Sequence, residues 1–342
     1  MRALVVTSPS RAEVMELEDP KPGQGELLIR VERVGICGTD VELFKGEMAY
    51  IDQGLTTFPI RLGHEWTGTV IEVGKGVNTS WINKRVTGDT MLGCGNCSYC
   101  LNGNQHVCPD RLEVGITDGW PGALAELHLI PERFALLIPD GLTLAAAALI
   151  EPGGNSLRSV AASEVNSGDR LLIIGAGTIG LLAAQFALAR GVEVHIAGAR
   201  KSSLQLAQDL GIPFIYSLDE ISVSEDRFDA VIDASSLVAA PGLAIKLVKP
   251  AGRIVLIGIS GSPSLVDSRE IALKDLTAVG ILSASPGLKS AIAIFSAGEV
   301  VPDSIVSEVI SLEEVPSRLL GARGENAGPG PKVQVDPRII HQ

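Results

Sequence analysis

Aromatic residues are scarce in this chain of 342 residues, where phenylalanine, tryptophan and tyrosine together make up 4%. Proteins that bind single-stranded nucleic acids stack bases on aromatic side chains, so this scarcity argues against such a platform. Clusters of lysine and arginine are also missing, and the formal net charge is −12. A nucleic-acid surface requires clustered positive charge. We therefore expect a small molecule, and no nucleic acid, as the partner of this protein.

Targeting signals are lacking as well. The apolar stretch at 3–6 is far shorter than the ~7–15 residues of a signal-peptide core, which predicts a cytoplasmic protein. One uncharged segment, 171–189, approaches the ~20 residues that a membrane span requires. Gly175, Gly177 and Gly180 lie within it, at the point where a strand would turn into a helix. This turn chemistry predicts a buried strand, turn and helix and no contact with a membrane.

Length and composition predict two folded domains. At ~150 residues per domain the chain corresponds to about two, and a hydrophobic fraction of 46% is typical of globular proteins. Runs rich in Val, Ile and Thr at 26–34 and 67–73 predict short strands in the first part. From residue 170, strand-length and helical patterns alternate, which predicts a parallel sheet; the strands are expected at 171–174, 192–197, 230–233 and 254–259, and the helices at 204–210 and 243–248. Strand-like segments at 306–310 and 333–335 are expected to rejoin the first domain.

Four of the five cysteines form a cluster, C-x2-C-x2-C-x7-C, made of Cys94, Cys97, Cys100 and Cys108. Disulfides are not expected in a reducing compartment. Four thiolates can bind one tetrahedral zinc ion, and the glycines and asparagines between them allow the loop to bend. An iron–sulfur cluster is the alternative for four cysteines. Because protein ligands would fill all four positions, the predicted zinc is structural rather than catalytic.

A glycine motif, GAGTIG, follows the apolar strand expected at 171–174 and precedes a helical run. It comprises Gly175, Gly177, Thr178, Ile179 and Gly180. A strand, a glycine turn and a helix in this order indicate a dinucleotide-binding site. The first glycine allows the tight turn, the second lets the backbone approach the pyrophosphate, and the third lets the helix pack closely on the strand. A plain glycine-rich turn is the alternative.

The second expected strand of this domain bears on the choice of cofactor. In NAD-binding sites an acidic residue ~20 positions after the first glycine holds the ribose hydroxyls, and no carboxylate occurs between 194 and 208. Gly198, Arg200 and Lys201 instead leave room and positive charge for a 2′-phosphate, which arginine binds through paired hydrogen bonds. The sequence therefore favours NADP over NAD. The alternative is that Arg200 and Lys201 are solvated at a helix start and that NAD is used.

Three further segments complete a recognisable pattern: GICGTD at 35–40, GHEWTG at 63–68 and EP at 151–152. With the cysteine cluster and GAGTIG, over nearly the full chain and in the same order, they resemble the zinc-containing medium-chain dehydrogenases, a family that includes alcohol, sorbitol, threonine and archaeal glucose dehydrogenases. The resemblance implies a Rossmann doubly wound parallel sheet inserted in a GroES-like, β-rich catalytic domain. We accordingly expect the catalytic domain at 1–152 with a zinc lobe at about 92–110, the Rossmann domain at 153–287, and a return to the catalytic domain at 288–342.

The resemblance also implies a second, catalytic zinc, held by Cys37, His64 and Glu151 with the fourth position open. No cysteine follows Cys108, so Glu151 takes the place of the second thiolate of a Cys2His site, as in polyol-type members of the family. Glu65 is an alternative or transient ligand. Without the resemblance, a lone cysteine and a lone histidine would be read as a core residue and a structural residue.

The resemblance also assigns roles to two residues that follow Cys37 in the chain. Thr39 matches the family hydroxyl that accepts the proton of the substrate, and Asp40 matches the carboxylate that orients the metal-bound histidine. Alcohol and sorbitol dehydrogenases usually have a histidine where this chain has Glu42, whereas archaeal glucose dehydrogenases have a glutamate there. Asn155 and Arg158 are candidates to face substrate hydroxyls, with solvated helix positions as the alternative.

These features together predict a zinc-dependent dehydrogenase that transfers hydride between NADP and a secondary alcohol, such as a polyol, a sugar or another small polar alcohol. An aliphatic alcohol dehydrogenase or ketone reductase is the nearest alternative. A zinc-free quinone-reductase-like relative would have lost Cys37, His64 and Glu151, which are present. A non-catalytic NADP-binding protein would not need the metal ligands together with Thr39. The resemblance further implies a homodimer or homotetramer.

Overall fold

The computed structural model describes residues 1–221 and 228–340. The chain divides into two compact units. Unit 1 consists of Met1–Glu151, Pro302–Gly328 and Lys332–Gln342, and unit 2 consists of Pro152–Val301 and Pro329–Pro331. Unit 2 thus interrupts unit 1 in the sequence, which is the arrangement expected of an inserted domain. The longer segment of unit 2 ends at Val301, beyond residue 287, and so includes α10 (Leu288–Ala297). The Phe295 ring of α10 stacks on the Phe186 ring of the same unit, with 5.8 Å between the ring centroids.

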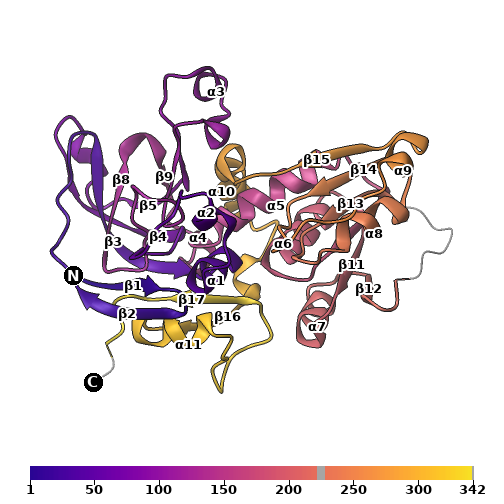
Figure 1. Cartoon of the computed structure of the whole chain (residues 1–342). Coiled ribbons are helices and arrows are strands. Elements are labelled where there is room, and N and C mark those ends of the chain that lie inside the picture. Colours follow the sequence, from indigo (N-terminus) through magenta and orange to yellow (C-terminus); the bar gives the residue numbers. More distant parts are fainter. Residues whose placement is uncertain (222–227, 341–342) are drawn as a thin grey trace. The chain divides into compact units, whose positions relative to one another are not determined.

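Unit 2 is built on a six-stranded parallel sheet in the order β12-β11-β10-β13-β14-β15 (Figure 1). The strands are β10 (Arg170–Ile174), β11 (Glu193–Gly198), β12 (Phe214–Ser217), β13 (Phe228–Asp233), β14 (Val248–Leu256) and β15 (Thr277–Gly280). The order reverses beside the first strand, β10, as in the Rossmann fold. The doubly wound parallel sheet expected from the sequence is therefore confirmed.

Helices connect these strands, as parallel pairing requires. Between successive strands lie α6 (Thr178–Leu188), α7 (Lys201–Asp209), α8 (Ala240–Leu247) and α9 (Ser268–Leu273), while α5 (Ile150–Ala162) precedes β10. Helix α6 packs against β10 and β11, and α8 packs against β13 and β14. The run 171–174 in β10 is fully buried, which explains why this strand is continuously apolar. No helix in the described parts of the chain is both long and apolar enough to cross a bilayer.

The strand boundaries differ from expectation at two places in unit 2. Strand β14 starts at Val248 and ends at Leu256, earlier than the expected 254–259, with an irregular register between Phe228 and Ala230 of its partner β13. Strands β12 and β15 were not expected at all. Both are four-residue edge strands with no buried residue. Their length is at the lower limit of the four to eight residues over which a pattern predicts a strand.

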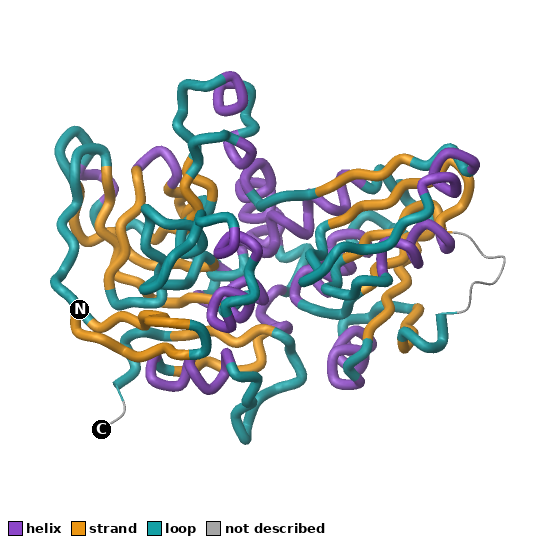
Figure 2. Tube along the Cα trace, in the orientation of Figure 1, coloured by secondary structure: helices purple, strands orange, loops and turns teal. Residues whose placement is uncertain are grey.

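Unit 1 is centred on a seven-stranded mixed sheet in the order β16-β17-β3-β4-β5-β9, with β8 also paired to β3 (Figure 2). Its strands are β3 (Glu26–Gly35), β4 (Glu65–Val73), β5 (Arg85–Gly88), β8 (Leu127–Pro131), β9 (Ala135–Leu137), β16 (Val306–Ile310) and β17 (Lys332–Val335). Strand β17 lies antiparallel to β3, with Val335 opposite Val34. The C-terminal strands therefore complete a sheet that the N-terminal half begins.

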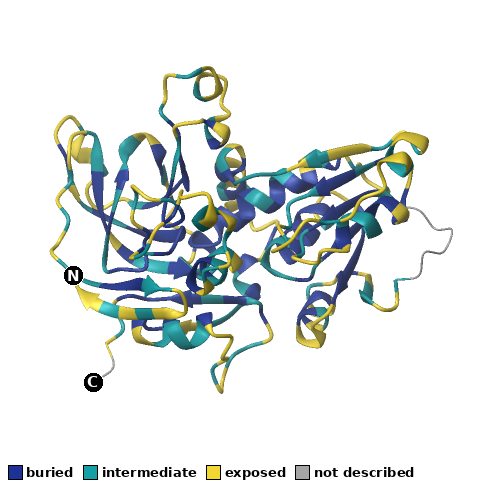
Figure 3. Cartoon of the chain, in the orientation of Figure 1, coloured by how far each residue is buried: buried dark blue, intermediate teal, exposed yellow. Residues whose placement is uncertain are grey.

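Smaller elements surround this sheet. Two two-stranded sheets pair β1 (Arg2–Ser8) with β2 (Arg11–Glu16) and β6 (Met91–Leu92) with β7 (Leu112–Glu113), and the short helices are α1 (Gly38–Lys45), α2 (Ala49–Asp52), α3 (Ser98–Leu101), α4 (Leu144–Ala147) and α11 (Val315–Leu319). Buried residues follow the sheets of each unit, whereas the lobe that carries α3 is largely exposed (Figure 3). A lobe without a hydrophobic core of its own needs another source of stability.

Candidate active site and metal centres

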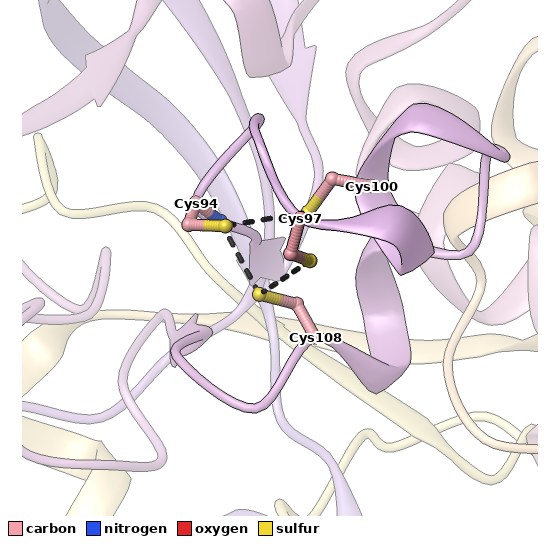
Figure 4. Close-up of side chains that lie close together, drawn as sticks. All are labelled: Cys94, Cys97, Cys100 and Cys108. Atoms are coloured by element: carbon pink, nitrogen blue, oxygen red, sulfur yellow. Dashed lines mark hydrogen bonds between the residues drawn. The ribbon is translucent and has the colours of Figure 1, made fainter.

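The exposed lobe of unit 1 brings the four clustered cysteines together (Figure 4). Their sulfur atoms all lie within 4.8 Å of one another, with 4.0 Å between Cys94 and Cys100 and 3.7 Å between Cys97 and Cys108. Four sulfurs bound at 2.3 Å to one tetrahedral zinc would lie about 3.8 Å apart. The thiols therefore already have the spacing that a single tetrahedral metal ion requires.

Turns and backbone contacts fix the cysteine cluster locally. Gly95 and Gly103 have positive φ angles of 84° and 76°, which non-glycine residues rarely adopt. The backbone N–H groups of Asn96 and Cys97 lower the pKa of Cys94 to about 6. The backbone N–H of Gly95 lowers the pKa of Cys100, but desolvation and the sulfurs of the other three cysteines outweigh it and raise this pKa to about 12. One thiol is thus ready to ionise at neutral pH, as metal binding requires.

A second group of potential ligands lies where β3 ends and β4 begins. Cys37 is the N-cap residue of α1, two positions after the end of β3, and His64 directly precedes Glu65, the first residue of β4. The sulfur of Cys37, a ring nitrogen of His64 and a carboxylate oxygen of Glu65 all lie within 4.8 Å of one another. The antiparallel register places Gly35 opposite Glu65, and a Cβ on Gly35 would lie 2.0 Å from Glu65 Oε2. Only glycine at 35 leaves room for this carboxylate.

Asp40 joins the two strands that supply the group. Its fully buried carboxylate accepts hydrogen bonds from the backbone N–H of Cys37 at 2.8 Å and of Gly63 at 3.3 Å. Its Oδ1 also lies 3.5 Å from His64 Nδ1. Burial lowers the pKa of His64, but Asp40 and Cys37 raise it further, so that its pKa lies well above the usual value. The surroundings of the histidine therefore favour positive charge.

Glu65 has a buried partner that was not predicted from the sequence. Lys332, the first residue of β17, places its Nζ 2.8 Å from Oε1 and 2.6 Å from Oε2 of Glu65. Burial lowers the pKa of Lys332, whereas Glu65, Cys37 and Asp40 raise it, and the net direction is upward. The signal available in the sequence was a lysine directly before the alternating residues Val333, Gln334 and Val335 of a short C-terminal strand.

The remaining predicted residues of this site lie on neighbouring elements. Thr39 and Glu42 are three residues apart on α1 and therefore share a face of the helix. Burial, with help from Glu47, raises the pKa of Glu42. Glu151, near the start of α5, is buried, and the group formed by Cys37, His64 and Glu65 does not include it. Arg158 instead donates to the backbone oxygens of Leu282 and Ser283.

The glycine motif of unit 2 has the conformations that a dinucleotide turn needs. Gly175 has a φ of 113°, and a Cβ on Gly180 would lie 1.8 Å from the carbonyl oxygen of Gly175. Gly177 is the N-cap residue of α6, and a Cβ there would meet no atom within 4 Å. Thr178 and Ile179 are the first two residues of the helix. The turn is therefore tight on its inner side and open above the helix N-terminus.

This turn borders a cavity of about 290 Å³ in unit 2. Gly175, Gly177, Gly198 and Arg200 line it, together with Ser203 and Ser235. Arg200 is the N-cap residue of α7. Among the described residues lining this cavity, Arg200 carries the charge and none is acidic. Lys201 borders a separate depression with Leu204 and Gln205, so the structure brings Arg200, but not Lys201, to the cavity.

Sequence reasoning did not include the polar end of β13. Asp233 is buried, and its Oδ1 accepts hydrogen bonds from the hydroxyl of Ser235 at 2.7 Å and from its N–H at 3.0 Å. Burial raises the pKa of Asp233 against these bonds. Ligands of doubly wound sheets bind beyond the carboxyl ends of the strands, so the polar DASS segment after the strand expected at 230–233 was an available signal.

Comparisons with known proteins agree with this geometry. Residues 23–140 match the alcohol dehydrogenase GroES-like domain, and residues 178–297 match the zinc-binding dehydrogenase domain. An L-threonine 3-dehydrogenase of Saccharopolyspora erythraea is 32% identical over 291 residues, which cover 82% of this chain and 83% of the relative. The chain belongs to the zinc-containing medium-chain dehydrogenase family. It is an oxidoreductase of the alcohol and polyol dehydrogenase type.

Other family members show the range of the relatives. A sorbitol dehydrogenase of Halalkalibacterium halodurans is 29% identical over 329 residues, covering 92% of this chain and 94% of the relative. Two solved structures, each covering 98% of this chain and 99% of their own, carry different cofactors. An alcohol dehydrogenase of Escherichia coli CFT073 is complexed with NADH (25% identity, TM-score 0.89), and a candidate zinc-binding dehydrogenase of Sinorhizobium meliloti 1021 is bound to NADP (28% identity, TM-score 0.88).

Proposed function

We propose that this dehydrogenase transfers hydride between NADP and a small polar secondary alcohol, with one catalytic and one structural zinc ion. The observation that carries the proposal is the group of half-buried Cys37 and buried His64, close to Asp40. The second unit of the same chain presents a glycine turn and a cavity lined by Arg200. A reactive constellation and a cofactor site in one chain support turnover rather than binding alone.

The donor atoms of the first unit suit zinc at two positions. The four thiols of the lobe suit a closed, structural site, and the mixed thiol, imidazole and carboxylate group suits an open one. We assign Cys37, His64 and Glu151 as the catalytic ligands, with Glu65 as the alternative carboxylate. Asp40 Oδ1 lies 3.5 Å from His64 Nδ1, and a carboxylate beside one ring nitrogen of a histidine favours the orientation in which the other nitrogen binds the metal.

Zinc bound at this group would polarise the substrate hydroxyl and ease its deprotonation. The residues of the chain then handle the proton. We assign the hydroxyl of Thr39 to accept it, and Glu42 lies three residues further along the same helix, on the same face. Because burial raises the pKa of Glu42, this carboxylate holds a proton more readily than an exposed glutamate does. Glu42 is thus suited to pass the proton onward.

Arg200 supports NADP as the cofactor. It lines the cavity beside Gly198, where an NAD-specific site would present a carboxylate to the ribose. Its guanidinium can bind a 2′-phosphate through two parallel hydrogen bonds. The NADP-bound relative is consistent with this choice, although the NADH-bound relative shows that both cofactors occur among similar folds.

The names of the relatives support a polar substrate, since sorbitol is a polyol and the C3 hydroxyl of threonine is a secondary alcohol. An aliphatic alcohol or ketone is the second candidate. We also infer a homodimer or homotetramer from the resemblance to the family, which sedimentation would measure.

The first experiment measures metal per chain in the purified protein and then follows NADP and NAD reduction with a panel of polyols, aldoses, hydroxy amino acids and aliphatic alcohols. Two zinc ions per chain, with faster turnover on polar secondary alcohols and NADP, are expected. One zinc ion and no turnover with any substrate would remove the catalytic assignment and leave the fold. Faster turnover on aliphatic alcohols would favour the second candidate.

A further inference from the structure

The pair formed by Glu65 and Lys332 is the most deeply buried ion pair at the candidate catalytic group, with side-chain exposures of 1% and 3%. Its members are 267 positions apart in the sequence. An ammonium group has three N–H donors. Lys332 Nζ uses them on Oε1 and Oε2 of Glu65 and on the carbonyl oxygen of Ile36, at 2.8, 2.6 and 2.9 Å. Every donor is matched, so the ammonium is held in one position.

Stability alone does not account for this pair. Removing two charges from water costs several kcal/mol per ion, and a well-packed apolar pair of similar volume is often equally stable or more so. The pair also requires glycine at position 35, because a Cβ there would clash with Glu65 Oε2. A costly arrangement at a potential metal site indicates a role toward the metal.

The position of Glu65 suggests what that role is. Its carboxylate lies within 4.8 Å of the donor atoms of Cys37 and His64, close enough for a modest side-chain rotation to bring it onto a metal ion that they hold. Both oxygens are instead engaged by Lys332. A dehydrogenase of this type needs an open coordination position for its substrate. Glu65 is therefore a competitor for that position, carried by the protein itself.

We propose that Lys332 is a positioning residue that holds Glu65 away from the catalytic metal and so keeps the substrate position open. The proposal rests on the proposed function, because it requires a metal at Cys37 and His64. Without Lys332, Glu65 would lose its partner in a buried, low-dielectric site and would bind the metal as the nearest cation. The enzyme would then keep its metal but bind other ligands weakly.

The test uses the full-length protein with cobalt in the catalytic site and imidazole as a neutral probe of the open position. The visible absorption spectrum reports the coordination of cobalt. Adding imidazole changes this spectrum only where the cobalt ion has an open position that imidazole can bind. We expect Lys332→Met to alter the cobalt spectrum before imidazole is added and to weaken imidazole binding at least tenfold. Lys332→Arg preserves the charge and should retain the affinity of the unmodified protein within a few fold.

A double variant separates positioning from simple damage. In Lys332→Met with Glu65→Gln, the competing carboxylate is gone, so imidazole affinity should return to within a few fold of that of the unmodified protein. Unchanged affinity in Lys332→Met, or a loss that the double variant does not restore, would overturn the proposal. If Lys332→Met does not fold, Glu65→Gln alone decides: a shifted cobalt spectrum before imidazole would show that Glu65 already binds the metal.

Failure of the proposed function has a different signature. If Cys37 and His64 hold no metal, the unmodified protein itself binds cobalt only at the four-cysteine lobe and shows no response to imidazole. The positioning role of Lys332 fails separately, when the unmodified protein responds to imidazole and the variants do not follow the expected order.

Discussion

The two units differ in how the chain supplies their sites. In unit 2, the glycine turn and Arg200 lie within 26 residues of one another, counted from 175 to 200. In unit 1, the group around His64 draws on the end of β3, the start of β4 and the start of β17, with Glu65 and Lys332 at a separation of 267 positions. The site of unit 2 is thus local in the sequence, whereas the site of unit 1 exists only after the sheet has closed.

Within unit 1 the same contrast separates the two candidate metal centres. The four cysteines lie in one exposed lobe, where turns alone bring them together. Cys37 and His64 depend on β3 and β4 being paired in register. A local site should tolerate damage elsewhere, and a site assembled from distant segments should not.

The largest effect is expected from Cys37→Ser. Loss of the thiolate removes a metal ligand and with it several kcal/mol of transition-state stabilisation, which corresponds to about a 10³-fold fall in kcat/KM. Metal analysis should show one zinc ion lost and one retained, and fluorescence titration should show NADP binding within a few fold of that of the unmodified protein. Loss of both zinc ions would mean that the two centres are not independent.

Cys100→Ser tests the local centre. Binding of structural zinc contributes directly to folding, so the free energy of unfolding should fall by a few kcal/mol, and the lobe should become sensitive to proteolysis. Turnover should fall much less than in Cys37→Ser, because the lobe leaves no position for substrate. Denaturant unfolding, peptide mapping and kcat/KM measure these effects. A loss of activity as large as that of Cys37→Ser would contradict a purely structural role.

Arg200→Ser should act on the cofactor alone. Hydrogen bonds to a charged group are worth about 1.5–3 kcal/mol, so kcat/KM for NADP should fall about 10- to 150-fold while that for NAD stays nearly constant. Zinc content should not change. Lys201→Ser is the matched control, since Lys201 does not line the cavity, and a smaller effect is expected. Equal losses for both cofactors would argue against recognition of the 2′-phosphate.

The same contrast decides what the sequence could predict. The central strands β10, β11 and β13 and the helix α7 were placed within a few residues, because continuous apolar runs and local turn chemistry mark them. The cysteine lobe was found from spacing alone. The group of Cys37 and His64 was found only through the family resemblance, because no local pattern indicates that β3 and β4 will bring these residues together.

Sequence patterns did not identify the residues whose roles depend on closure of the sheet. Lys332 was not singled out, because a lysine in a short strand ordinarily indicates an edge facing solvent, yet this one is 2% exposed. The choice between Glu65 and Glu151 as the catalytic carboxylate likewise depends on tertiary structure. In both cases the deciding partner lies in a different part of the chain, beyond the reach of periodicity or spacing.

The smallest effect concerns His128, a residue of β8 that is completely buried in the sheet of unit 1. The centroids of the His128 and Trp66 rings lie 4.9 Å apart. In the described structure neither ring nitrogen has a hydrogen-bond partner, and burial, together with Arg61, lowers its pKa well below the usual 6.5. The folded protein therefore keeps this ring neutral at acidic pH, where the unfolded chain binds a proton. As pH falls below 6.5, the free energy of unfolding should decrease by up to about 1.4 kcal/mol per pH unit until the folded pKa is reached.

Comparing urea unfolding of the unmodified protein with His128→Phe between pH 7 and pH 5 isolates this contribution, because phenylalanine keeps the ring against Trp66 and cannot be protonated. The difference in unfolding free energy between the two proteins should shift with pH in favour of the variant. Since His128 belongs to the sheet that brings Cys37 and His64 together, acid should weaken the assembled site of unit 1 through the stability of its sheet. Identical pH profiles would show that the folded protein can protonate His128 without cost.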